Sequence, residues 1–293
     1  MDIAKVIHEM CKDEYFSHHV YKFLAKSPLV SEKLKIVLEK AAEDEFKHYS
    51  FWKNIVGECA SRISMFKVLL FTAIFYLFGL TVTLKFIESK EYNATELYKN
   101  IIENEPGLKD EVDKIIRDEE RHEKEFASNI DEGRVKYIGS ITLGISDALV
   151  ELTGIYTGSL GAFENTLSAG LTGLLAGIAA SISMGIASYA QAKHEGRLNP
   201  KMSAFYTAIA YLIVVLVLAL PYFLIGSLAI AFVVMLTLAI AVVAYITFYA
   251  SVLHDRKYLR EFTETTLLIF GVSILLYVLG SVLGTILGVK QVD

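Results

Sequence analysis

The side chains with the clearest chemical potential form two copies of one short motif, a glutamate followed three residues later by a histidine. The first copy is Glu45-Phe-Lys-His48, and the second is Glu119-Glu-Arg-His122. Residues three apart share a helix face, so each copy can present a carboxylate and an imidazole together. One copy in a charged helix occurs often by chance. Two copies on separate helices favour a metal site over a solvated charged face.

Bringing these two motifs together requires a set of packed helices. Pro28 breaks the chain after a first helix, Ser31 can cap the second, and Pro106 suits the first turn of a fourth. The motifs then fall on the second and fourth helices. The sequence predicts helices at residues 2–25, 31–57, 76–103 and 106–131.

The other two predicted helices supply further carboxylates, with Glu14 on the first and both Glu88 and Glu91 on the third. Two Glu-x-x-His pairs joined by single glutamates are the ligand set of di-iron carboxylate bundles. Hard carboxylates with imidazole nitrogens suit iron or manganese. His18 and His19 are close to Glu14 in sequence, but we expect them to be polar surface or bundle-edge residues rather than ligands.

On these residues the first part of the chain resembles the rubrerythrin-type ferritin-like family. The resemblance extends to Tyr21, seven residues after Glu14, and to the Glu88-Ser-Lys-Glu91 pair. The sequence contains no Cys-x-x-Cys pair, so the rubredoxin module of full rubrerythrins is missing, which counts against a complete peroxidase cycle on this chain alone. The resemblance implies a di-iron centre, or a manganese centre, with the ligands Glu14, Glu45, His48, Glu88, Glu91, Glu119 and His122.

Charge divides the chain into two parts. Of the 61 acidic and basic residues, 45 precede position 136 and 16 are spread over the remaining 158 positions. We therefore predict an all-α protein with two domains, a ferritin-like four-helix bundle at 1–132 and a five-helix membrane domain at 133–293. The net charge of −5 gives no basic face for nucleic acid. Cys11 and Cys59 are too few for a disulfide framework, and they lie in the part that we assign to the reducing cytosol.

The apolar part predicts a multi-pass protein of the cell membrane. The opening residues are charged and amphipathic and do not read as a secretory signal. Lysine and arginine occur in the second and fourth connections between the apolar runs but not in the first and third. The positive-inside rule then puts the N-terminal domain in the cytosol and the C-terminus on the opposite side. Five runs are long enough to cross a core of about 30 Å: 137–160, 167–190, 202–224, 227–253 and 265–289.

A sixth apolar run, at 65–84, contains one charged residue, Lys67. Hydropathy alone would make it a membrane span. A single crossing here, however, would put the two Glu-x-x-His motifs on opposite sides of the membrane. We therefore expect an in-plane or bundle-buried segment, with Gly79 near the start of a helix that continues through Glu88 and Glu91.

Within the membrane part, the informative residues are those that a bilayer disfavours. Asp147 and Glu151 are four residues apart in the first span, hence on one face, and carboxylates at this depth indicate a cavity, a cation or a proton. The alternative is that both lie near the cytosolic interface. Met184 in the second span could offer a soft thioether to a transition ion, although a membrane methionine usually serves packing.

These segments resemble the vacuolar iron transporter family, through LGISDALVELTG around Asp147 and SISMGIASYAQAKHE around Met184. The resemblance covers 137–289 and implies metal–proton antiport by a homodimer, with Asp147, Glu151 and Met184 lining the path. The glutamate-rich insert between spans two and three of plant members is absent, since only 191–201 connects these spans. End to end, the chain resembles the erythrin-vacuolar iron transport family of membrane-bound ferritins.

The expected function is therefore export of Fe²⁺, with Mn²⁺ as a further cargo, by exchange for protons. The cytosolic di-metal domain would capture, sense or oxidise the metal. The rival interpretation is a membrane-anchored ferroxidase or peroxide-scavenging enzyme, in which the spans act as an anchor. A structural membrane protein with an acidic interaction bundle would leave both Glu-x-x-His pairs unexplained.

Overall fold

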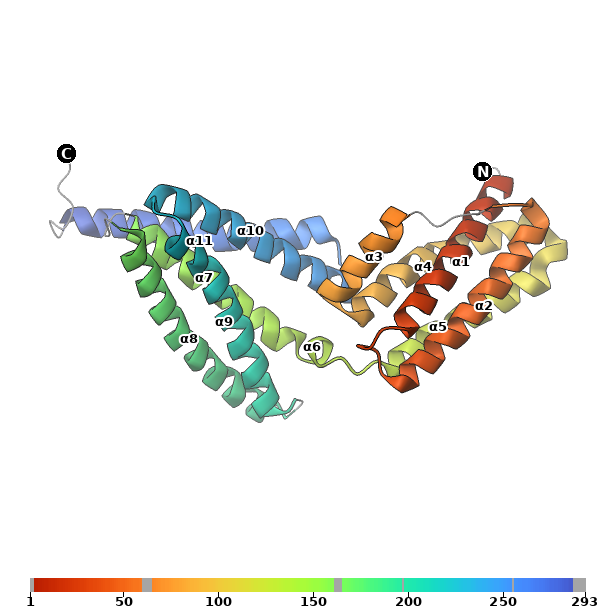
Figure 1. Ribbon diagram of the computed structural model, residues 1–293, viewed down its shortest axis with the longest axis horizontal. Helices are drawn as coiled ribbons and strands as arrows, with labels where there is room; N and C mark the ends of the chain where they lie inside the picture. The colour runs from red at the N-terminus through yellow and green to blue at the C-terminus, as the bar shows by residue number, and fades with distance from the viewer. Residues whose placement is uncertain (1–2, 60–64, 161–164, 197, 255, 287–293) are drawn as a thin grey trace. The chain divides into compact units, whose positions relative to one another are not determined.

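The computed structural model describes residues 3–59, 65–160, 165–196, 198–254 and 256–286, and these residues form helices without any strand (Figure 1). The predicted all-α class is confirmed at this level. The chain divides into two compact units, Met1–Glu132 and Gly133–Asp293, each with its own hydrophobic core.

The first unit consists of long helices in mutual contact. Helix α1 contacts α2 and α4, and α5 contacts the same two helices, so these four pack side by side in a ring (Figure 1). The Ser31 hydroxyl caps α2 by accepting the backbone N–H of Leu34 at 3.4 Å, as predicted. The helices are α1 (Ile3–Ala25), α2 (Glu32–Val56), α3 (Met65–Phe78), α4 (Leu80–Asn104), the short 3-10 helix η1 (Pro106–Leu108) and α5 (Lys109–Asn129).

The core of the first unit is divided into two apolar clusters. One contains Tyr21, Leu38 and Phe126, and the other contains Trp52 and Val112. Both clusters draw side chains from α1, α2, α4 and α5, and they leave one short interval on each helix between them. The intervals lie between Cys11 and Phe16 on α1, Ala42 and Tyr49 on α2, Ile87 and Tyr98 on α4, and Ile115 and Phe126 on α5.

The apolar run at 65–84 is broken at Gly79, whose φ of 87° lies in the left-handed region that favours glycine. Helix α3 ends before it and α4 begins after it, so the third helix starts later than the predicted residue 76. Helix α3 has 14 residues, too few to cross a bilayer. Its side chains Phe71 and Phe75 are buried in the first unit's core, and Phe66 is 74% exposed. The run is therefore packed on the bundle, as expected.

Cys11 and Cys59 form a disulfide, which corrects the expectation from cysteine number and compartment. Cys11 is on α1 and Cys59 follows the end of α2, and their Cα atoms are 6.0 Å apart. The packing of α1 against α2 brings together two cysteines that are 48 residues apart in sequence. No spacing rule for a pair this distant could have indicated the bond from sequence.

In the second unit, four helices within the described residues are long and apolar enough to cross a membrane: α7, α8, α9 and α10. The fifth predicted span, at 265–289, coincides with α11 up to residue 286, and its last three residues lie outside the described part. Helix α11 is not among those four. The helices are α6 (Gly133–Lys136), α7 (Ile138–Ser159), α8 (Thr166–Glu195), α9 (Pro200–Leu224), α10 (Leu228–Leu253) and α11 (Tyr258–Ile286).

Glycines allow α7 and α8 to approach α9 closely. A Cβ atom at Gly144 of α7 would lie 2.4 Å from the carbonyl oxygen of Thr207 on α9, and one at Gly177 of α8 would lie 2.6 Å from the side chain of Val215. At Gly139 of α7, by contrast, a Cβ atom would meet nothing within 4 Å. The glycines of the second unit therefore differ in what an added side chain would meet.

We expect Gly144→Ala to destabilise the second unit by about 1–3 kcal/mol, because the new methyl group meets backbone that cannot rotate away. Gly139→Ala on the same helix is the matched control and should leave stability unchanged or slightly raised, since alanine favours helix. Thermal unfolding of the full chain in detergent measures both. Equal melting temperatures for the two variants would contradict the close α7–α9 contact.

Candidate metal centre

Five of the predicted ligands meet between the two apolar clusters of the first unit. One ligand atom from each of Glu14, Glu45, His48 and Glu119 lies within 4.8 Å of the others. His122 of α5 joins them, with Nδ1 3.4 Å from Glu45 Oε1. These ligands form a polar layer between the clusters, and three of its side chains are almost inaccessible to water, with exposures of 1–4%: Glu45, His48 and His122.

Glu119 lies between the two histidines. Its Oε1 is 3.2 Å from Nδ1 of His48, and its Oε2 is 3.5 Å from Nδ1 of His122. Glu14 Oε2 approaches the same Nδ1 of His48 at 3.3 Å. Each imidazole thus turns Nδ1 toward a pair of carboxylates, and one carboxylate is common to both. Glu119 can therefore serve both histidines within one site.

The residues present fit a metal ion, on the basis of atoms that lack hydrogen bonds. Nδ1 of His48, Nδ1 of His122 and Oε2 of Glu119 are buried and make no hydrogen bond within the described residues. They face oppositely charged groups at 3.2–3.5 Å but do not meet hydrogen-bond geometry. Buried polar atoms that make no hydrogen bond are rare, because each costs about 1–3 kcal/mol. A cation held between these atoms would satisfy all three at once.

The opposite ring nitrogens face aspartates that the sequence analysis did not single out. Nε2 of His48 is 3.3 Å from Asp118, and Nε2 of His122 is 3.5 Å from Asp44. Arg121 binds both aspartates, at 2.5 Å and 2.6 Å. Such partners fix the tautomer that leaves Nδ1 free to ligate. A signal was available, since each Glu-x-x-His is preceded by an aspartate, and each aspartate serves the histidine of the other motif.

Glu14 is held by two aromatic side chains. The indole N–H of Trp52 donates to its Oε1 at 3.4 Å, and the hydroxyl of Tyr98 donates to the same oxygen at 3.3 Å. The two rings are stacked, with an interplanar angle of 10°. Glu14 therefore keeps one oxygen on the aromatic side and presents the other to His48. Neither Trp52 nor Tyr98 belongs to a recognisable motif.

Two predicted ligands cannot be placed by their side chains. Glu88 and Glu91 belong to α4, in the interval of that helix between the two apolar clusters, but their side chains lie outside the described part of the chain. His18 and His19 bond instead to backbone carbonyls, through Nδ1–H groups that donate to Ala42 and Tyr15. His18 is buried at 8% exposure, which corrects the expectation of a surface position for that residue.

The carboxylates and imidazoles of this site change one another's pKa values. Burial lowers the pKa of His48, but Glu14 and Glu119 outweigh it and raise the pKa to about 11. Burial raises the pKa of Glu119, but His122 and His48 outweigh it and lower the pKa to about 2. Because the folded state raises the pKa of His48, the protonated side chain stabilises the metal-free fold. This stabilisation is complete at pH values below the ordinary pKa of 6.5. That stabilisation is lost as the pH rises through about 11.

In the second unit, Asp147 and Glu151 lie on α7, both partly buried. The hydroxyl of Tyr211 on α9 donates a hydrogen bond to Glu151 Oε2. Sequence analysis did not predict this partner, although a tyrosine within an apolar span was a signal. Met184 of α8 packs at the edge of the same core. Among the described residues, Asp147 and Glu151 join no group of three metal-type side chains.

Hydroxyl groups of α7, α8 and α9 form a series of hydrogen bonds inside the core of the second unit, here called the polar seam. Ser140 and Ser203 share a hydrogen bond of 2.6 Å, and the Thr207 hydroxyl lies within 3.0 Å of both the Ser140 carbonyl and the Ser188 hydroxyl. Thr207 precedes Tyr211 by one helical turn, so both face α7. These groups satisfy one another inside an otherwise apolar core.

Comparison with protein-family models, with curated proteins and with solved structures found no match. The function is therefore argued from this chain's own residues.

Metal binding at the first unit should release about one proton, because at neutral pH the raised pKa keeps His48 protonated until a cation displaces that proton. The association constant should rise about tenfold per pH unit between pH 6 and 9. Calorimetry in buffers of different ionisation enthalpy counts the proton. A pH-independent affinity would contradict the pairing of His48 with Glu14 and Glu119.

Proposed function

We propose that the first unit is a ferritin-like di-metal carboxylate bundle that holds iron, with manganese as the alternative. The observation that carries this proposal is the position of Glu119 between the Nδ1 atoms of His48 and His122. Glu14 and Glu45 complete a set of three carboxylates and two imidazoles, a donor set suited to these metals. Glu88 and Glu91 lie in the interval of α4 between the two apolar clusters, and we propose them as further ligands.

The chain's own residues perform three tasks at this centre. Glu119 connects the two histidines of the site. Trp52 and Tyr98 orient Glu14 by donating hydrogen bonds to it. Asp118 and Asp44 accept hydrogen bonds from the Nε2–H groups of the histidines. An iron pair bound here would supply one-electron redox chemistry. The apolar clusters on either side limit the access of water to the layer.

For the second unit we propose transport of Fe²⁺, with Mn²⁺ as a second cargo, out of the cytosol in exchange for protons. Two carboxylates within a span, Asp147 and Glu151, support this function because such groups are retained in bilayers for ions or protons. Tyr211 orients Glu151. A proton that enters from the outer side would neutralise a carboxylate and release its metal, and Met184 is the soft ligand that we propose nearby.

The wider proposal is membership of the erythrin-vacuolar iron transport family, with α11 as a fifth span and a homodimer as the assembly. The basic second and fourth connections support a cytosolic first unit. The four helices of spanning length support a multi-pass membrane protein. The exposed leucines and isoleucines of α8 and α9 suit contact with lipid.

The metal centre is tested with Glu119→Gln and with Glu120→Gln, its neighbour, which points to the outside of α5 with a side chain 62% exposed. Anaerobic titration of the full chain with Fe²⁺ or Mn²⁺ should show a loss of at least about 100-fold for Glu119→Gln, the upper end of the effect of an outer-shell partner. Glu120→Gln should bind as the native chain does. Equal binding by both variants would remove the proposed centre.

Transport is tested in proteoliposomes of known orientation, with Asp147→Asn and with Glu264→Gln, an exposed carboxylate on α11. Asp147→Asn should abolish metal flux and the accompanying pH change, because it removes charge without changing size. Glu264→Gln should retain both. Absence of flux in the native chain, together with oxygen or peroxide consumption on addition of Fe²⁺, would support the anchored ferroxidase or peroxide-scavenging enzyme instead.

A further inference from the structure

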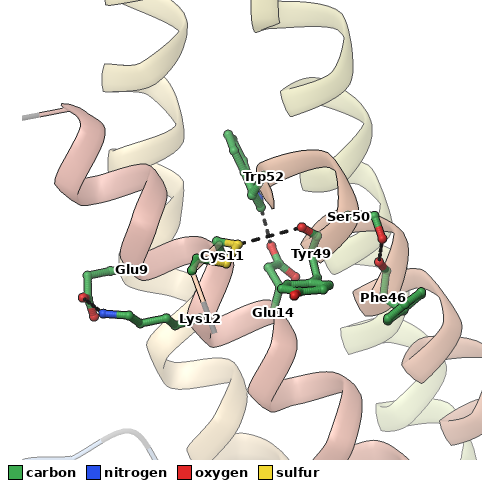
Figure 2. The surroundings of a disulfide bond; sticks show 9 residues. Glu9, Cys11, Lys12, Glu14, Phe46, Tyr49, Ser50 and Trp52 are labelled. Carbon is green, nitrogen blue, oxygen red and sulfur yellow. Dashed lines mark hydrogen bonds and ion pairs between the residues drawn. A yellow bond between two sulfur atoms is a disulfide. The ribbon is translucent and has the colours of Figure 1, made fainter. Parts of the chain in front are cut away.

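The Cys11–Cys59 disulfide lies one helical turn from a metal-site residue. Cys11 and Glu14 are three residues apart on α1, and Figure 2 shows the disulfide beside the Glu14, Tyr49 and Trp52 side chains. The Sγ atom of Cys11 is 3.9 Å from the carbonyl oxygen of Tyr49 on α2. The disulfide therefore ties the part of α1 that carries Glu14 to the residues that directly follow α2, the helix that carries His48.

The disulfide shares its packing with the groups that hold Glu14. Cys11, Cys59, Trp52 and Tyr98 belong to one buried apolar cluster. Trp52 and Tyr98 donate to one oxygen of Glu14, and the other oxygen faces His48 at 3.3 Å. A change in the link between α1 and the end of α2 would thus reach the metal site through the orientation of Glu14.

The compartment adds a second argument. The basic connections of the second unit favour a cytosolic first unit, and the cytosol keeps most thiols reduced. Cytosolic disulfides, where they occur, are usually transient and serve catalysis or redox sensing. A disulfide beside a metal ligand in that compartment is therefore better suited to respond to redox state than to act as a permanent link.

We propose that Cys11 and Cys59 form a redox modification site that controls how tightly the metal centre holds its ion. The inference rests on the proposed metal-binding function. In the oxidised form the disulfide fixes α1 so that Glu14 faces His48. In the reduced form α1 loses this restraint, and the centre holds metal more weakly. The reactants are a cellular dithiol in one direction and a peroxide in the other.

The exchange follows ordinary thiol–disulfide chemistry. Cys11 is fully buried and Cys59 is 7% exposed, so a dithiol reductant attacks Sγ of Cys59. The protein S–S bond breaks, and Cys11 leaves as a thiolate that takes up a proton. The second thiol of the reductant then closes its own disulfide and releases Cys59 as a thiol. In the reverse direction, one hydrogen peroxide oxidises the two thiols to the disulfide and yields two water molecules.

The test compares Mn²⁺ binding by the full chain in its oxidised form and after reduction with dithiothreitol, which is removed anaerobically before the titration. The amount of free Mn²⁺ is followed by electron paramagnetic resonance. The oxidised form should bind about tenfold more tightly, the scale of the effect of an outer-shell partner. Cys11→Ser with Cys59→Ser should bind like the reduced form after either treatment.

The reciprocal measurement separates control from simple stabilisation. If the disulfide tightens metal binding tenfold, saturating Mn²⁺ must shift the equilibrium with dithiothreitol tenfold toward the disulfide. Alkylation of thiols reads that equilibrium. Glu14→Gln should remove the shift, whereas Glu120→Gln should keep it.

The outcomes are distinct. Equal Mn²⁺ affinity in both redox states, with an unshifted dithiothreitol equilibrium, overturns the redox site and leaves the metal centre intact. A disulfide that dithiothreitol does not reduce in the folded chain also overturns it. Absence of both Mn²⁺ and Fe²⁺ binding in both states, under anaerobic conditions, removes the proposed metal centre and this inference together.

Discussion

The first unit depends on burying carboxylates and imidazoles between two apolar clusters. Isolated charges in such a layer would cost far more than a protein's net stability, so they must be compensated locally. Glu119 pairs with both histidines, and Arg121 pairs with the aspartates behind them. The compensation leaves both Nδ1 atoms facing carboxylates, where a proton or a metal cation can complete it. Competition between proton and metal is thus built into the layer.

The second unit also buries polar groups, but it compensates their desolvation differently. Its polar seam uses mostly neutral hydroxyls, which satisfy one another at small desolvation cost. Gly144 lets α7 and α9 come close at Thr207, and one turn further along α9 Tyr211 reaches Glu151. The close approach of the backbones and the partner of the buried carboxylate therefore depend on one helix contact.

Sequence patterns predicted the parts of the centre that repeat. Both Glu-x-x-His motifs and the helices that carry them follow from spacing, because helical periodicity is local. Glu14 was indicated only as a carboxylate on the first helix. The partners of these residues do not follow in the same way. Asp118 contacts the histidine 70 residues before it, and Trp52 and Tyr98 reach Glu14 from two other helices. A pairing between helices depends on their relative rotation, which no local pattern encodes.

The sequence by itself determined the helical class, the change from a charged to an apolar part, a helix start near Gly79 and most candidate ligands. These properties depend on composition, backbone conformation and periodicity, which are set within a few residues. Only the tertiary structure decided that Glu119 is the shared carboxylate, that Tyr211 serves Glu151 and that Cys11 meets Cys59. Each of these features needs a contact between residues that are 48 or more positions apart. It therefore depends on how whole helices pack, and neither partner specifies it alone.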